Sequence, residues 1–176
     1  MKLFKKLAAA ALAAVLALSM VGCGAGGKGS ALDLKNEVLN LIEDTYYMDD
    51  NTATHTTAMD TAAAKLIEDA AKAGAAEGNK DDTKALLEKQ TIEGGGSYIA
   101  IFAPYTQLRT EFMQYSYIHQ MNTALSAVTI GNSSYDNMIA KIGDPVIGEG
   151  DSIEMGAATG TIKGKNYLVL LVKKAA

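Results

Sequence analysis

Cys23 is the only cysteine of this 176-residue chain, and the residues before it predict a covalent modification. Residues 1–6 carry three lysines, residues 7–21 form an apolar run of Ala, Leu, Val and Met with one Ser, and Gly22 directly precedes the cysteine. This order is typical of a bacterial secretion signal that ends in a lipobox. The expected chemistry is thioether attachment of a diacylglyceryl group to Cys23, cleavage before it, and acylation of the new amino terminus.

Two other interpretations of this segment remain open, an ordinary signal peptide with a chance cysteine and a short membrane span. The apolar run is shorter than the roughly 20 residues that a spanning helix needs, and the chain has no second cysteine to pair with Cys23. Two or more acyl chains, such as palmitate, anchor stably at roughly 0.8 kcal/mol per buried CH₂. We therefore expect an extracytoplasmic protein that is lipid-anchored to the bacterial cell membrane.

The charge balance restricts the partners of the expected mature chain. Removal of residues 1–22 takes three lysines and no acid from 16 basic and 20 acidic residues, so the formal charge falls from −4 to −7. An acidic chain with a single arginine, Arg109, does not suit nucleic acid, whose phosphates require clustered Lys and Arg. Electrostatic docking on anionic lipid is equally unfavourable, so the acyl anchor must hold the protein at the membrane.

The composition along the chain divides it into three parts. Residues 1–22 are the predicted signal peptide, residues 23–30 form a Gly-rich tether, and residues 31–176 form a single domain with its own core. With no cysteine beyond the anchor, the domain has no disulfide framework and no thiolate metal site. We expect no cofactor.

Hydrophobic periodicity predicts the elements that position the side chains of this domain. Helices are expected after a Ser30/Asp33 cap, over 58–73 after a Thr57/Asp60 cap, over 81–89, from Pro104 onward, and after a Ser133/Asp136 cap with Met138, Ile139 and Ile142 inward. Strands are expected over 98–102, 152–162 and 167–172, with turns at 143–145 and 163–166.

The last expected strand decides the fold class. Residues 167–172 (YLVLLV) are apolar on both faces, which is typical of a central strand covered by helices on both sides. With helices early and strands late, the sequence predicts an α+β fold, a three-layer α/β/α sandwich whose carboxy-terminal hairpin supplies the central strands.

Five segments resemble, in order, motifs of the bacterial CAP superfamily of cysteine-rich secretory, antigen 5 and pathogenesis-related proteins. They are the opening helix at 34–42, a helix of the "L…AA…RA" kind at 59–64, G-E-N-I-A at 96–100, N-S-x-x-H-R-x-N-I-L at 132–139, and the terminal strands at 155–169. The resemblance spans about residues 33–172 and implies the same sandwich. It also implies a cleft, which Ser97, Tyr98 and Tyr135 would border.

The departures from the CAP motifs bear on function more than the matches. Members with a metal-binding cleft use two histidines and two acidic residues, but here Ser97 replaces the acid of G-E-N-I-A and Tyr135 replaces a histidine. His55 and His119 occupy no matching position. Since zinc needs three or four converging ligands, the resemblance implies a degenerate cleft without a metal, and it carries over no catalytic residue.

The two histidines could do chemistry on their own. His119 could act as a general base, but its helical spacing from Leu108, Phe112 and Tyr115 favours a position on the buried face of a helix. His55 lies among threonines ahead of a helix cap, which favours a solvated loop.

Four further groups each have a structural interpretation that we favour. Ser133 and Ser134 lack a nucleophile elbow, and capping explains Ser133. The glycines 94–96 could cradle an anion but lack the other residues of a phosphate-binding loop, which favours a turn. An acidic segment lacks EF-hand spacing and favours a solvated loop over a Ca²⁺ site. Seven tyrosines could line a glycan or peptide groove, although we favour packing in the core and at its boundary. The acidic residues are Asp144, Glu149, Asp151 and Glu154, and the tyrosines are Tyr46, Tyr47, Tyr98, Tyr105, Tyr115, Tyr117 and Tyr135.

The sequence therefore favours a domain that binds rather than catalyses, with a cell-wall component, a peptide or a protein as its ligand. Two alternatives stay open: a hydrolase of the cell wall or of extracytoplasmic peptides, and a structural protein of the envelope.

Overall fold

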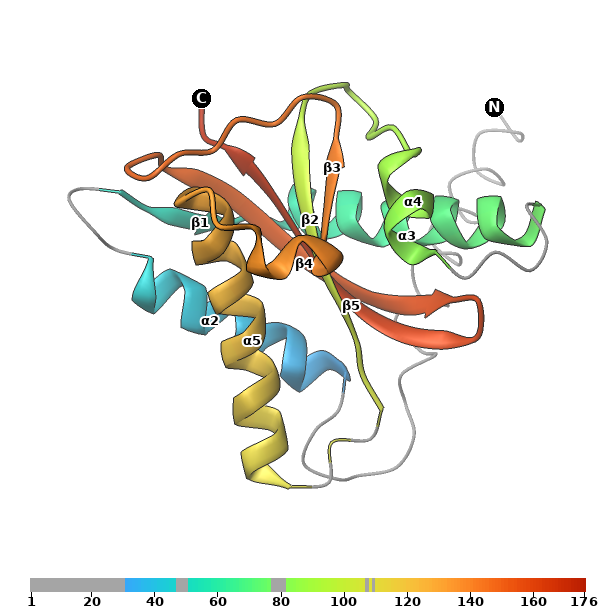
Figure 1. Ribbon diagram of the computed structural model, residues 1–176, viewed down its shortest axis with the longest axis horizontal. Helices are drawn as coiled ribbons and strands as arrows, with labels where there is room; N and C mark the ends of the chain where they lie inside the picture. Colours follow the sequence, from blue (N-terminus) through green and yellow to red (C-terminus); the bar gives the residue numbers. More distant parts are fainter. Residues whose placement is uncertain (1–30, 47–50, 77–81, 107, 109) are drawn as a thin grey trace, which may run out of the picture.

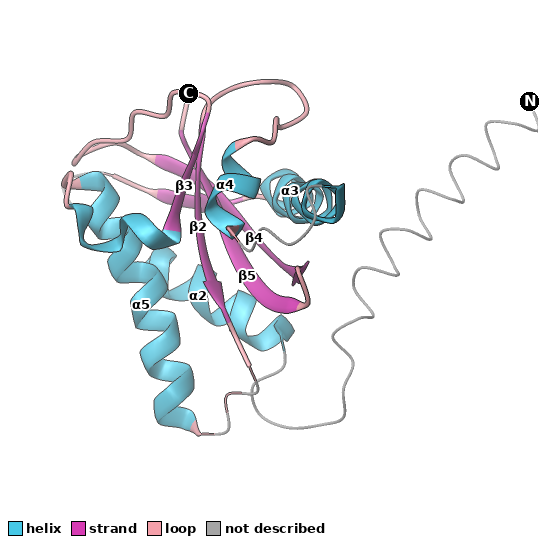
Figure 2. Cartoon of the chain, turned by 45° about the vertical axis from the view of Figure 1, so that its right-hand side comes forward, coloured by secondary structure: helices cyan, strands magenta, loops and turns pink. Residues whose placement is uncertain are grey.

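The computed structural model describes residues 31–46, 51–76, 82–106, 108 and 110–176 of the chain. A five-stranded sheet lies between two layers of helices (Figure 1, Figure 2). Helices α2 and α5 cover one face, and helices α3 and α4 cover the other. The α+β class and the three-layer arrangement expected from the sequence are confirmed. Cys23 and the tether 23–30 lie outside the described residues.

The described residues form five helices and five strands. The helices are α2 (Ala31–Thr45), α3 (Thr57–Ala76), α4 (Thr83–Glu88), α5 (Glu111–Thr129) and the 3₁₀ helix η1 (Ser133–Met138). The strands are β1 (Ala53–His55), β2 (Tyr98–Pro104), β3 (Ile139–Ile142), β4 (Ile153–Ile162) and β5 (Lys165–Lys174). Their order in the sheet is β1-β4-β5-β2-β3, and only β1 runs parallel to its neighbour.

Strand β5 is the centre of the sheet, as its two-faced apolar sequence predicts. Leu168, Leu170 and Val172 point into the core under α2 and α5, while the alternate residues Val169 and Leu171 point into the core under α3 and α4. Strands β4 and β2 flank it on either side. The β4–β5 turn is two residues long, and both have positive φ, 52° and 77°, which matches the right-handed twist of the hairpin.

Helix α3 lies unusually close to β4 because two glycines of the strand face it. A Cβ on Gly156 would lie 2.3 Å from the backbone nitrogen of Asp60 and 2.4 Å from the carbonyl carbon of Met59. A Cβ on Gly160 would lie 2.5 Å from Cγ2 of Ile67. At these two positions no side chain of the strand separates β4 from the helix, so α3 packs directly against the strand backbone.

Three expected elements differ from the structure. Pro104 ends strand β2 instead of starting a helix, and α5 begins at Glu111 after the cap Thr110. The proline fits this position because its nitrogen, which carries no hydrogen, faces the side of β2 that β3 does not reach. The next residue, Tyr105, faces the other side and donates its backbone N–H to the carbonyl of Asn166 in β5. Residues 139–142 form strand β3, not a helix, and α3 continues through Gly74 to Ala76.

The fourth difference is strand β1, where the sequence favoured a loop around His55. Ala53–His55 pairs with residues 153–155 of β4.

Within the described part of the chain, no helix combines the length and apolar character needed to cross a membrane.

We expect Gly156→Ala to destabilise the domain by about 3 kcal/mol, because the added methyl group meets backbone atoms of α3 that cannot rotate away. Gly160→Ala should cost less, about 1 kcal/mol, since its obstacle is a side chain. Chemical denaturation followed by circular dichroism measures both free energies of unfolding.

The matched control is Gly148→Ala, whose added Cβ has only an ordinary contact of 3.8 Å with Asp151. It should change the unfolding free energy by less than about 0.5 kcal/mol. Equal stability of Gly156→Ala and Gly148→Ala would contradict the close packing of α3 on β4.

Candidate functional site

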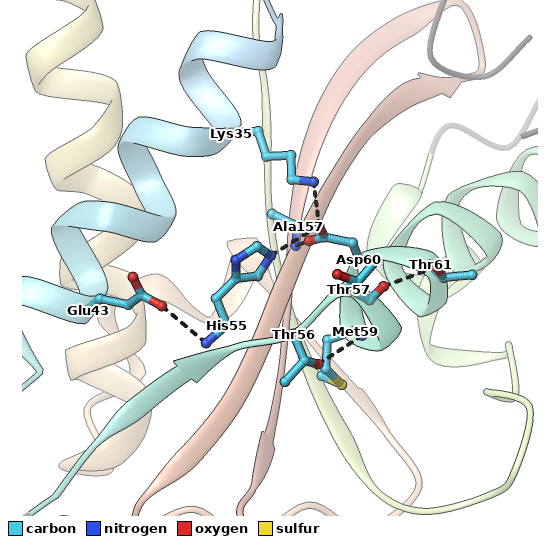
Figure 3. A network of polar contacts seen from close by, with 9 residues as sticks. All are labelled: Lys35, Glu43, His55, Thr56, Thr57, Met59, Asp60, Thr61 and Ala157. Carbon is cyan, nitrogen blue, oxygen red and sulfur yellow. Dashed lines mark hydrogen bonds and ion pairs between the residues drawn. The ribbon is translucent and has the colours of Figure 1, made fainter. Parts of the chain in front are cut away.

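A polar network centred on Asp60 joins both helical layers at the edge of the sheet (Figure 3). One carboxylate oxygen, Oδ2, accepts from Nζ of Lys35 at 2.6 Å and from Nε2 of His55 at 3.0 Å. The other, Oδ1, accepts from the backbone N–H of Ala157 at 2.9 Å. Lys35 comes from α2, His55 from β1, Asp60 from α3 and Ala157 from β4, so one carboxylate connects four elements.

The path of the backbone explains why a carboxylate stands here. Strand β1 passes into α3 with only Thr56 between them, and Thr56 Oγ1 accepts from the N–H of Met59 as the helix cap. The carbonyl of Thr56 accepts from the N–H of Asp60 in the first helical turn, and the N–H of Ala157 donates to the Asp60 carboxylate. The N–H of Ala157 is the next donor that β4 presents on this side, and the carboxylate takes the place of the lost strand partner.

The structure therefore corrects the expected cap of α3. The Thr57/Asp60 pair predicted from the sequence is displaced by one residue, because the capping hydroxyl belongs to Thr56. Thr57 instead accepts with its carbonyl oxygen from Thr61. The side chain of Asp60 is thereby directed to the neighbouring elements.

The surroundings of Asp60 determine its ionisation. Partial burial by itself would raise its pKa, but the hydrogen bonds from Lys35, from the N–H of Ala157 and from His55 outweigh it, so the pKa of Asp60 lies below its ordinary value. Its place in the first turn of α3 adds the favourable field of the helix amino terminus. The carboxylate is charged at neutral pH, and its side chain is only 19% exposed.

A His–Asp pair is a frequent component of catalytic sites, so the surroundings of His55 decide what this pair can do. Nε2 of the His55 ring contacts Oδ2 of Asp60, and the backbone N–H of His55 donates to Oε1 of Glu43 at 3.2 Å. In the described ranges no three His, Cys, Asp or Glu side chains converge as metal ligands. The contacts of the network cross-link elements of the fold. His55 lies in strand β1 and not in the expected loop, although it is exposed as expected.

Of the residues predicted to border a cleft, Ser97 and Tyr98 are neighbours in the chain, whereas Tyr135 lies apart from them. Ser97 Oγ accepts from the N–H of Asp144 at 3.0 Å. Tyr98 is buried in the core under α3 and α4, whereas Tyr135 packs against the core under α2 and α5. The two tyrosines thus contact opposite faces of the sheet, and the ligand-binding role of the three residues stays a prediction.

His119 does not belong to the buried face of helix α5, and the face predicted with it is not the buried one. Phe112 and Tyr115 are exposed, and His119 is partly exposed with its ring 4.0 Å from the ring of Tyr115. The buried face of α5 is formed instead by another set, Tyr117, Ile118, Met121, Ala124, Leu125 and Ala127. The helix is apolar on more than one side, so periodicity selected the wrong face.

The acidic segment and the tyrosines serve local contacts. Asp151 pairs with Lys174 at 2.6 Å, and Glu154 pairs with Lys173 at 2.9 Å, which joins the ends of β4 and β5. Several tyrosine hydroxyls bond within the fold: Tyr46 to the carbonyl of Asp151, Tyr98 to that of Gly95, Tyr117 to that of Ala103, and Tyr167 to the hydroxyl of Thr83. These tyrosines are spread over the domain and do not line one groove, and Tyr47 lies outside the described residues.

A small open pocket lies between α3 and the segment 91–93, where sequence reasoning predicted no site. Its volume is about 340 Å³. Alanine and leucine side chains of α3 and Ile92 supply apolar lining, while Lys65 and Glu93 place opposite charges on it. The lining residues are Ala58, Thr61, Ala62, Lys65, Leu66, Thr91, Ile92 and Glu93. Among these described residues none is a histidine, serine or cysteine.

Comparison with known proteins found no relative of this chain. No family model, no curated protein and no solved structure matches the chain.

We expect Asp60→Ala to lower the unfolding free energy by about 2 kcal/mol, because Lys35, His55 and the N–H of Ala157 all lose their acceptor. Asp60→Asn should cost less, since an amide oxygen can still accept from Ala157. The control Asp69→Asn affects only ion pairs with the exposed Lys65 and Lys72 and should cost less than about 0.5 kcal/mol.

The same residue predicts a pH dependence. Because the pKa of Asp60 is lowered by folding, its stabilising contribution is present above the unfolded pKa of about 3.9 and is lost as the pH falls through the folded pKa. The difference in unfolding free energy between the parent and Asp60→Asn should therefore shrink below about pH 4. A difference that stayed constant as the pH fell well below 4 would contradict the ionised state of Asp60.

Proposed function

We propose that the chain is an extracytoplasmic bacterial lipoprotein whose domain, 31–176, is a non-catalytic binding module of degenerate CAP-like type. Acyl chains on Cys23 hold it to the cell membrane, and residues 23–30 tether the domain close to the bilayer. The basic, apolar and small residues that end at Cys23 support the anchor.

The pocket between α3 and residues 91–93 is the observation that carries the binding role. Its volume of about 340 Å³ lies within the range of small-ligand sites and suits one or two side chains of a ligand. The carboxylate of Asp69 accepts a hydrogen bond from Lys65 at 3.0 Å and raises the pKa of Lys65, so a cation faces the pocket at neutral pH. Glu93 supplies the opposite charge.

This lining favours a peptide as the ligand. An apolar side chain of the peptide would contact Leu66 and Ile92, while its charged or backbone groups would meet Lys65 and Glu93. The Asp60 carboxylate does not line this pocket, and its contacts with Lys35, His55 and the N–H of Ala157 cross-link the fold.

We expect Ala62→Leu to fill the pocket and weaken peptide binding by about tenfold, equivalent to about 1.4 kcal/mol. Isothermal titration with a panel of short synthetic peptides and peptides released from cell wall measures this change. The control Ala75→Leu adds the same side chain at an exposed position near the end of α3. Peptide binding that is equally strong in both variants would contradict the assignment of the pocket.

We expect Cys23→Ser to abolish acylation and the cleavage that follows it, because the thioether cannot form, so that the variant keeps residues 1–22. Mass spectrometry of the amino-terminal peptide measures both effects. The control Ser30→Ala changes a hydroxyl in the tether and should leave acylation intact. An acylated Cys23→Ser variant would contradict the proposed anchor.

A further inference from the structure

The first turns of α5 carry a group of exposed apolar side chains that the fold does not use. Phe112 is 78% exposed, Tyr115 is 60% exposed and Met113 is 43% exposed. The buried residues of this helix begin only at Tyr117. We call Phe112, Met113 and Tyr115 the α5 tip. Large apolar side chains clustered on an exposed helix end are typical of an interaction surface.

The surroundings of the α5 tip contain few charged residues. Between residues 101 and 135 the sequence has only Arg109 and Glu111 as charged side chains, although 20% of the whole chain is charged. Helix α3, by contrast, carries five: Asp60, Lys65, Glu68, Asp69 and Lys72. The exposed residues of α5 beyond its tip are instead uncharged, for example Ser116, Gln120 and Ser126. A nearly neutral, apolar helix end avoids the repulsion that an acidic surface meets at anionic lipid.

The position of the α5 tip connects it to the membrane. Helix α5 begins at the lower end of the molecule in Figure 1, and α2 begins in the lower half, above the start of α5; the view in Figure 2 agrees. Ala31, where α2 begins, is eight residues from Cys23. Eight residues span at most about 28 Å when extended, and a Gly-rich coil of this length averages about 15 Å. The anchor would thus hold this end of the domain next to the bilayer.

We infer that the α5 tip inserts into the headgroup region of the membrane as a second contact beside the lipid anchor. The inference rests on the proposed acylation of Cys23. Phenylalanine and methionine suit the acyl boundary, and tyrosine suits the headgroup level, where its ring is apolar and its hydroxyl remains hydrated. Three side chains are too few for a stable dimer, which buries about 800 Å² per partner. The contact fixes the orientation of the domain and holds the opposite end of the sheet away from the membrane.

The chain has no tryptophan, so one introduced indole reports on its own surroundings. The test uses the processed, full-length protein with Phe112→Trp, reconstituted in vesicles of phosphatidylethanolamine and phosphatidylglycerol. The matched control is Val146→Trp, at a position that is 74% exposed in the β3–β4 loop at the opposite end of the molecule (Figure 1). Acyl chains carrying bromine quench an indole that enters the bilayer, and mass spectrometry first establishes acylation of Cys23 in both variants.

We expect blue-shifted emission from Phe112→Trp and quenching by brominated lipid several-fold stronger than in Val146→Trp. Equal quenching of the two acylated variants would overturn the membrane contact and leave the lipid anchor intact. A blue shift that depends on protein concentration, without quenching by the lipid, would overturn it in favour of a second copy. Absence of acylation at Cys23 would overturn both the anchor and the contact that rests on it.

Discussion

The direct contact between the backbone of α3 and strand β4 is the constraint on which the arrangement of the domain depends. It exists because Gly156 has no side chain, so the atoms of Met59 and Asp60 lie where a Cβ would otherwise be. At this distance the carboxylate of Asp60 reaches the N–H of Ala157 at 2.9 Å. The turn from β1 into α3 can then be abrupt, because the donor that the strand abandons is satisfied at once.

The same carboxylate relates the two helical layers. Helices α2 and α3 contact opposite faces of the sheet, and Lys35 of α2 reaches Asp60 of α3 beside the edge strand β1. Lys35 and His55 both contact Asp60 on this edge. This ionic contact fixes the distance between α2 and α3, which the packing of the two apolar cores does not determine. Apolar burial supplies most of the stability, whereas this polar contact selects one relative position of the layers.

Much of the fold could be predicted from the sequence, and the failures have physical causes. Helix α3 was predicted because its apolar residues follow the helical period, and β5 because a short run that is apolar on both faces is typical of a buried central strand. Strand β1 was not, since Ala53–His55 has little strand character and depends on its partner β4, about 100 residues away. The buried face of α5 was wrong because this helix has apolar residues on several sides, and only tertiary packing chooses between them. The partners of Asp60 had no sequence signal, because Lys35 and Ala157 are 25 and 97 residues away from it.

The central place of β5 has a consequence for the order in which the domain can form. This strand is the last element of the chain, and β4 and β2 both pair with it. During synthesis, residues 31–164 therefore have no centre on which either helical layer can assemble, and the two cores stay open until residues 165–174 emerge. The domain therefore folds only once β5 is available, and the long-range pairing that closes it makes folding slow relative to that of a helical bundle of similar size.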